Sequence, residues 1–335
     1  MFSRTTRRAL VAVSAVAATS LALAGCASSD ATPSDDTASV EPTPITYQMG
    51  WLPTVEWASS WIAIDEGLYE DAGVAFEYLP GGPNVSDDTV VASGQADVGS
   101  ASVDSVAAAV EAGADFKIIA AAFKKSPFSI VSLAETPIET PEDMIGKKIG
   151  VAAANQSQFD LFLEINEIDP ADVEVVPVQF DPSPVANGEV DGQVVYSVNE
   201  PGQLNVQGID TYTMLFADFG FEVLTDVYYV TPDTIAEKGE ALAAFLSATS
   251  DGWDALFADP QLGVDLTLET YGADLDLNGD QQLLQVAAMQ ELMGSEPYLI
   301  MTDDEMQASV DTVNLMGYDF TVEDLFDTSI QELMG

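Results

Sequence analysis

The chain has 335 residues, of which 56 are Asp or Glu and 9 are Lys or Arg, so its formal net charge at pH 7 is −47. A chain this acidic repels polyanions, which excludes nucleic acid as a partner. The sequence has no histidine and a single cysteine, which excludes His-based catalysis, His-ligated metals and intramolecular disulfides. We therefore expect that this protein is not an enzyme and that it has neither a metal site nor a cofactor.

The first 25 residues have the three parts of a lipoprotein export signal. Three arginines among the first eight residues precede an apolar run over 10–22 that is too short to span a bilayer, and Leu-Ala-Gly-Cys26 follows. We expect cleavage before Cys26 and lipidation of this cysteine, which would anchor the mature protein to the extracytoplasmic face of the cell membrane. Residues 26–44 are rich in Ser, Asp, Thr, Ala and Pro, which predicts a disordered tether.

From residue 45 the chain alternates between short apolar runs and segments in which apolar residues have helical spacing. Short connections between alternating strands and helices are typical of a parallel, open α/β sheet. Such a sheet binds ligands at the carboxyl ends of its strands. The predicted strands are 45–49, 74–79, a short one ending at 99, and 117–122, and the predicted helices are 55–68, 87–93 and 103–112.

A second, similar pattern begins near residue 128. Strands are predicted at 129–133 and 148–151, and Thr140-Pro141 predicts the start of a helix between them. The two similar halves predict two lobes, with 45–126 plus 229–335 as lobe 1 and 127–228 as lobe 2. The alternation continues through 159–166, 173–177, 182–188 and 193–198, and from residue 227 onward helices are predicted near 237–257, 263–271, 281–293 and 303–316.

Three tryptophans lie close to the end of the first predicted strand. Trp51 follows the strand directly, Trp57 lies in the first turn of the next helix, and Trp61 is one turn further along the same face. The position at a strand end favours Trp51 and Trp57 as a stacking wall for a ligand. Trp61 fits a ligand contact and core packing equally well, whereas Trp253 is expected in the core.

Polar residues recur at the other strand ends and would face a gap between the lobes. Each is also an ordinary turn or cap residue, so their shared location carries the prediction. Among the lysines, Lys124 and Lys125 are placed where they could reach an anionic ligand. Residues 274–280 match the first half of a calcium loop, but Gln285 at the twelfth position favours a helix cap. The polar candidates for ligand binding are Glu56, Asn84, Ser102, Asn155, Tyr196, Asn199 and Glu200.

Several short motifs resemble, in order and spacing, one group of ABC-transporter substrate-binding proteins. This group includes binders of thiamine-pyrimidine precursors, riboflavin, aliphatic sulfonates and nitrate, and the resemblance covers about residues 45–240. It implies a type II periplasmic-binding fold, whose two α/β lobes close over a small molecule, and an ABC permease with its ATPase as partners. The motifs are Gly50-Trp51-Leu52-Pro53, the runs 61–69, 72–74, 81–83, 93–99 and 140–151, Asn199-Glu200-Pro201 and Asp218-Phe219-Gly220.

The ligand is predicted less directly. In the pyrimidine branch of this group, a histidine usually occupies the position that Trp57 has in this sequence. This chain therefore departs from the pyrimidine-branch pattern at that position. The tryptophans, the acidic field and the absence of arginine after the signal favour a flat neutral or cationic heterocycle, such as a thiamine-precursor pyrimidine or riboflavin. We expect a monomeric, lipid-anchored receptor for such a heterocycle. The alternatives are an aliphatic sulfonate, taurine or nitrate-like anion on the same fold, and, less favoured, a related pyrimidine-precursor synthase, whose histidine and cysteine-rich motif this chain lacks.

Overall fold

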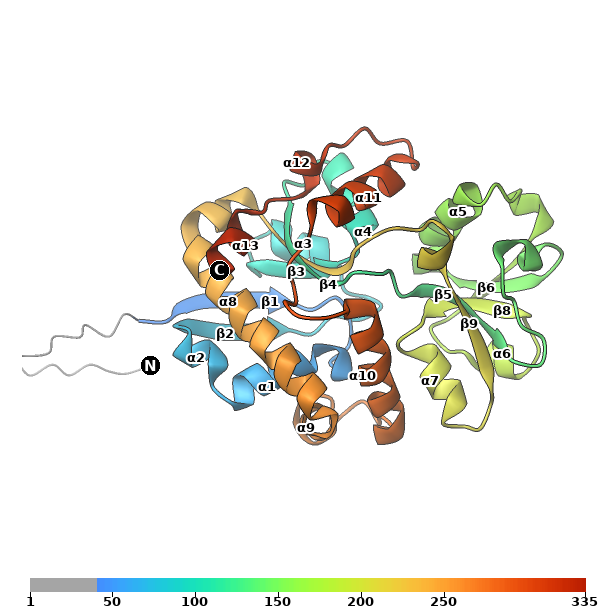
Figure 1. The fold of residues 1–335 in the computed structure, drawn as a ribbon, viewed down its shortest axis with the longest axis horizontal. Helices are drawn as coiled ribbons and strands as arrows, with labels where there is room; N and C mark the ends of the chain where they lie inside the picture. The colour runs from blue at the N-terminus through green and yellow to red at the C-terminus, as the bar shows by residue number, and fades with distance from the viewer. Residues whose placement is uncertain (1–40) are drawn as a thin grey trace, which may run out of the picture. The chain divides into compact units, whose positions relative to one another are not determined.

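Two five-stranded sheets organise residues 41–335, the part of the chain that the computed structural model describes (Figure 1). The expected export signal, Cys26 and most of the expected tether lie outside these residues. The first strand begins at Thr43, within the range expected for the tether, because Thr43 already pairs in parallel with Val74 of the neighbouring strand.

The first sheet has the strand order β2-β1-β3-β10-β4. β1 pairs in parallel with β2 and β3, whereas β10 runs antiparallel to both β3 and β4. Every residue of β10 is buried, which fits a central strand covered on both faces. The strands are β1 (Thr43–Gln48), β2 (Val74–Leu79), β3 (Val98–Ala101), β4 (Lys117–Phe123) and β10 (Thr225–Val230).

Helices from both ends of the described chain pack on the first sheet (Figure 1). Two of them, α1 and α8, cross closely, since a Cβ atom at Gly252 would lie 2.1 Å from the backbone oxygen of Ser59. No helix within residues 41–335 has the length and apolar content needed to cross a bilayer. The elements are η1 (Val55–Trp57), α1 (Ala58–Asp65), α2 (Leu68–Asp71), α3 (Asp87–Ala92), α4 (Val103–Glu111), α8 (Pro232–Ala258), α9 (Pro260–Leu266), the π-helical η6 (Thr267–Tyr271), α10 (Gly279–Met293), α11 (Asp303–Asn314), α12 (Val322–Leu325) and α13 (Ser329–Met334).

The second sheet has the order β7-β6-β8-β5-β9, with β6 parallel to β7 and β8 and with β5 antiparallel to β8 and β9. The chain enters this sheet after β4 and returns to the first sheet after β9. The elements are β5 (Phe128–Leu133), η2 (Pro141–Met144), β6 (Lys148–Ala152), η3 (Ala153–Asn155), α5 (Gln156–Ile165), η4 (Pro170–Asp172), β7 (Glu174–Val178), α6 (Ser183–Ala186), β8 (Gly192–Tyr196), α7 (Glu200–Asn205), β9 (Thr211–Leu215) and η5 (Phe216–Phe219).

The predicted α/β class is confirmed, but the sheets are mixed and not purely parallel. The sequence analysis did not predict β9 or β10. It predicted that a mainly helical region begins at residue 227, which lies within β10. Val227, Tyr228 and Tyr229 are residues that favour strands, and their apolar run merges in the sequence with the pattern of α8. The predicted boundaries between the two lobes stay a prediction. The expected boundary at residue 228 falls inside β10, and β10 pairs only with β3 and β4 of the first sheet.

Candidate functional site

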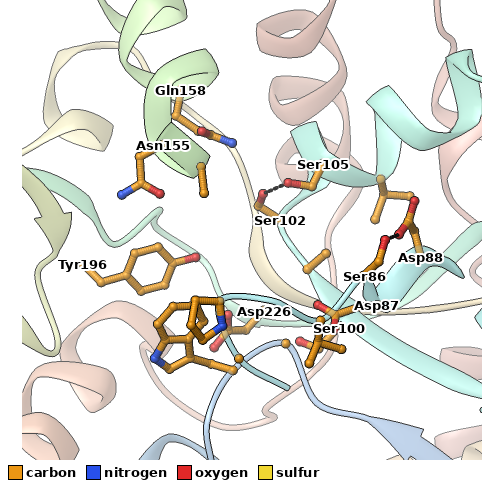
Figure 2. Close-up of a pocket in the computed structure, with 18 of the residues that line it drawn as sticks. Ser86, Asp87, Asp88, Ser100, Ser102, Ser105, Asn155, Gln158, Tyr196 and Asp226 are labelled. Carbon is orange, nitrogen blue, oxygen red and sulfur yellow. Dashed lines mark hydrogen bonds between the residues drawn. The ribbon is translucent and has the colours of Figure 1, made fainter. Parts of the chain in front are cut away.

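A cavity of about 670 Å³ lies at the carboxyl ends of strands from both sheets (Figure 2). β1 leads into Gly50 and Trp51, β6 leads into Asn155, and β8 ends at Tyr196, and all four residues line the cavity. Strand ends converge there because the backbone turns toward a helix at each of these points. The cavity is therefore where the sequence predicted a ligand site.

The ten predicted ligand-binding residues divide into two groups. Trp61 is fully buried in the core, where its ring stacks on Tyr271 at 4.2 Å and its Nε1 donates to the backbone oxygen of Thr54 at 3.4 Å. Asn84 is exposed and is not part of the lining. Tyr271, the ring on which Trp61 stacks, lies about two hundred residues later in the chain, so the local spacing of the tryptophans could not reveal this contact. The other eight line the cavity: Trp51, Glu56, Trp57, Ser102, Asn155, Tyr196, Asn199 and Glu200.

Aromatic rings from both sheets face the cavity. Trp51 meets Phe180 edge to face, with ring centroids 4.9 Å apart, and Phe180 follows the end of β7. Trp57 is held in place because its Nε1 donates to the backbone oxygen of Leu52 at 3.1 Å. Tyr196 packs edge to face on Phe128 at 5.0 Å. The sequence analysis missed Phe180, although its place just after a strand was the signal that identified the other candidates.

Three carboxyl groups of the lining are almost fully buried. The exposed fractions of Glu56, Asp226 and Glu200 are 7%, 9% and 5%. Burial raises the pKa of Glu200 to about 7, even though its Oε2 accepts a hydrogen bond from the Tyr196 backbone nitrogen at 3.0 Å. Burial also raises the pKa of Glu56 well above its ordinary value, and the nearby Asp226 raises it further. These groups hold protons more firmly than exposed carboxyls do.

Asp226 was not predicted as a site residue. It has φ of +48° within β10, a conformation that non-glycine residues seldom adopt and that costs on the order of 1 kcal/mol or more. Burial raises its pKa to about 7. Nothing in the local sequence separated this aspartate from the many others, because its burial depends on strand pairing that the sequence analysis did not predict.

One arm of the cavity is lined by hydroxyl and carboxyl groups. Ser102 and Ser105 share a hydrogen bond of 3.0 Å, and the Ser86 hydroxyl donates to Asp88 at 2.7 Å (Figure 2). Burial raises the pKa of Asp87 to about 7. The hydroxyl of Ser100, which is 1% exposed, has no hydrogen-bond partner among residues 41–335. This arm offers a ligand mainly hydrogen-bond acceptors and rotatable hydroxyls.

Basic side chains lie away from the cavity. Within the described part of the chain, neither Lys nor Arg belongs to the lining. Lys124 pairs with Glu305 at 3.6 Å and Lys125 pairs with Asp218 at 3.2 Å, so neither reaches a ligand as the sequence analysis had allowed. The lining therefore provides no cationic side chain for an anion.

Metal binding finds no support in the same residues. Over 41–335, no group of three or more His, Cys, Asp or Glu side chains is arranged to hold a metal ion. In the stretch 274–280, Asn278 caps α10, because its side chain accepts from the Gln281 backbone nitrogen at 3.0 Å. The helix-cap interpretation of this stretch is confirmed.

Comparisons with known proteins agree with this fold. Residues 55–262 match the model of the family described as NMT1/THI5 like. The riboflavin-binding protein RibY of Chloroflexus aurantiacus is 27% identical over 255 residues, which are 72% of this chain and 71% of RibY. The aliphatic sulphonate binding protein SsuA of Escherichia coli has a TM-score of 0.66 at 14% identity, with 82% of this chain and 92% of SsuA covered.

A second solved structure shows the same fold. The alkanesulfonate-binding protein SsuA of Xanthomonas axonopodis pv. citri has a TM-score of 0.62 at 14% identity, with 88% of this chain and 98% of that chain covered. Both likenesses confirm the periplasmic-binding fold that the sequence motifs predicted, and at this identity they concern the fold alone. Because its family model matches more than half of the sequence, this chain belongs to the NMT1/THI5-like family.

Proposed function

We propose that this protein is the substrate-binding component of an ABC importer and that it binds a small aromatic nitrogen heterocycle. The observation that carries the proposal is the lining of the cavity, which combines aromatic rings from both sheets with buried acceptors and, within residues 41–335, has no basic side chain. Flat rings stack on aromatic side chains, and ring N–H and amino groups donate to carboxylate and hydroxyl oxygens. RibY, a relative at 27% identity, is named for binding a molecule of this class.

The roles of the lining residues follow from their positions. Trp51 and Phe180 come from different sheets and meet at the cavity, so a ring inserted beside them would contact both lobes. Trp57, fixed by its bond to the Leu52 backbone, would form a second wall. Glu56, Ser102, Asn155, Tyr196 and Glu200 would bind the edges of the ring.

A sulfonate or nitrate-like anion is the weaker proposal. An anion in this cavity would meet several carboxyl groups without a cationic side chain from residues 41–335 to offset them. The acidic character of the whole chain adds to the repulsion. The likeness to sulfonate-binding structures lies at 14% identity and says nothing about the lining.

The membrane attachment belongs to the same proposal. Cys26 lies outside the described residues, and the sequence pattern around it supports a lipid anchor. The receptor would then act as an extracytoplasmic monomer and would deliver its ligand to a permease and its ATPase.

Two measurements test the proposed ligand class. Mass spectrometry of small molecules released from purified, denatured protein should recover a flavin or a pyrimidine, and recovery of a sulfonate would contradict the proposal. Calorimetry with riboflavin, a thiamine-precursor pyrimidine and taurine should show binding of a heterocycle, and Trp51→Ala should weaken it at least tenfold by removing a stacking face. Tyr212→Ala, which removes an exposed aromatic of β9, is the matched control and should leave the affinity unchanged.

A further inference from the structure

Two acidic side chains from distant parts of the chain meet at the cavity. Glu56 lies in η1, the first helical element after β1, and Asp226 lies in β10, directly after the second crossing between the sheets. Both line the cavity and both are more than nine-tenths buried. Each alters the titration of the other: burial raises the pKa of Glu56 and the nearby Asp226 raises it further, whereas Glu56 lowers the pKa of Asp226, which burial raises.

The backbone holds Asp226 in this place at a cost. Its φ of +48° within a fully buried strand is strained for an aspartate, and glycine would relieve that strain. A buried carboxyl group beside a second carboxyl adds a further cost, because neither can be ionised freely. Backbone strain and burial beside a second acid both destabilise the fold at Asp226. This combination points to a role for Asp226 in binding and not in stability.

No positive charge from the described residues offsets this pair. The titratable groups that act on Glu56 or Asp226, or respond to them, are all acids or phenols, and they come from three other strands and helices as well as from β10 itself. A second sign of a missing ligand is the Ser100 hydroxyl in the same lining, which is buried and meets hydrogen-bond geometry with no group within 41–335, although it lies close enough to the Tyr47 hydroxyl to lower the pKa of that phenol. The groups around the pair are Tyr47 of β1, Tyr196 of β8, Glu200 of α7 and Tyr228 of β10, and Asp104 of α4 acts on Tyr196.

We propose that Glu56 and Asp226 recognise a positively charged, amidinium-type edge of the bound heterocycle and that this edge replaces a proton held by the pair. The inference rests on the proposed function and specifies its ligand class. When the cationic edge binds, the Asp226 carboxyl releases one proton to solvent. The resulting carboxylate accepts hydrogen bonds from that edge. Glu56 keeps its own proton, and no covalent bond forms or breaks.

The step sets the sign of the pH dependence. Burial raises the pKa of Asp226 to about 7, so below pH 7 the incoming cation must displace a proton. Affinity for a cation should therefore rise about tenfold for each pH unit between 5 and 7 and level off above that range. A neutral ligand of the same shape should show no such slope.

Benzamidine, benzamide and benzenesulfonate provide a matched set of probes, because they combine one aromatic ring with a cationic, a neutral and an anionic group. We expect benzamidine to bind at least tenfold more tightly than benzamide at pH 8, with release of about one proton per molecule at pH 6 in calorimetry with two buffers. Asp226→Asn should abolish the pH slope. Asp71→Asn removes the same charge from an exposed site on α2 and should keep the slope.

Each outcome decides the inference. Equal affinity for benzamidine and benzamide, a flat pH profile, or no benzamidine binding at millimolar concentration would overturn it. If riboflavin nevertheless binds tightly, the proposed function stands without this inference, whereas preference for benzenesulfonate and taurine would overturn both. Should Asp226→Asn fail to fold, infrared titration of the wild type and of Glu56→Gln decides, because Glu200 and Asp87 also hold protons to about pH 7. A protonated carboxyl band above pH 7 that is lost in Glu56→Gln supports the pair, and a band unchanged in the variant or complete ionisation by pH 7 contradicts it.

Discussion

Glu200 gives the sharpest test of how the buried acids affect stability. Its carboxyl group is 5% exposed at the start of α7, and burial raises its pKa to about 7 from an ordinary value of 4.5. The folded state therefore holds this proton more tightly than the unfolded state does. For an acid with a raised pKa, stability is complete below pH 4.5 and is lost progressively until the pH passes 7.

The size of the loss follows from the shift. A difference of one pKa unit corresponds to about 1.4 kcal/mol, so the folded state should lose about 2.5 kcal/mol through Glu200 between pH 5 and pH 8. Glu200→Gln removes the titration and keeps an oxygen that can accept the 3.0 Å hydrogen bond from the Tyr196 nitrogen. The variant should therefore become more stable relative to the wild type as the pH rises, by about this amount.

Urea unfolding at pH 5, 6, 7 and 8 and constant ionic strength, followed by tryptophan fluorescence, measures this change. Glu164→Gln removes a carboxyl from the exposed face of α5 and serves as the control, which should follow the wild-type curve. Parallel stability curves for the wild type and Glu200→Gln across this range would refute the claim that burial of Glu200 shapes the pH dependence.

Three further predictions concern other parts of the chain. Trp61→Ala should lower the free energy of unfolding by about 3–5 kcal/mol in urea titrations, because a fully buried ring that stacks on Tyr271 is lost. Gly252→Ala should destabilise by at least about 1–3 kcal/mol and lower the melting temperature, because its Cβ would lie 2.1 Å from the Ser59 oxygen where α1 and α8 cross. Cys26→Ser should move the protein from the membrane fraction to the soluble fraction, and retention at the membrane would contradict a lipid anchor.

Much of the fold was predictable because it depends on local patterns. Apolar runs bounded by glycine and proline identified β1, β2, β4, β5 and β6. β10 was missed for a different reason. Its position in the centre of the first sheet depends on pairing with β3 and β4, which lie more than a hundred residues earlier, and its apolar run continues into a helical pattern.

The candidate site was predictable to the extent that strand ends converge. Trp51, Asn155 and Tyr196 follow predicted strands and do line one cavity. Asp226 could not be singled out by residue type in so acidic a chain, because only tertiary packing shows which of the 56 acidic residues are buried together. Phe180, by contrast, follows a predicted strand, so the same strand-end signal could have identified it.

Hydrogen bonds between side chains join the two halves of the cavity and bear on how a ligand enters. Gln158 of α5 donates to Asp104 of α4 at 2.6 Å, and Gln281 of α10 donates to the Asn199 side-chain oxygen at 3.1 Å, just before α7. Each bond contributes on the order of 1 kcal/mol, or somewhat more for the charged acceptor, so separating these elements costs only a few kcal/mol. A ring placed beside Trp51 and Phe180 would add contacts of comparable strength to both residues. A bound ring would therefore strengthen the same junction between the two halves of the cavity that these hydrogen bonds form.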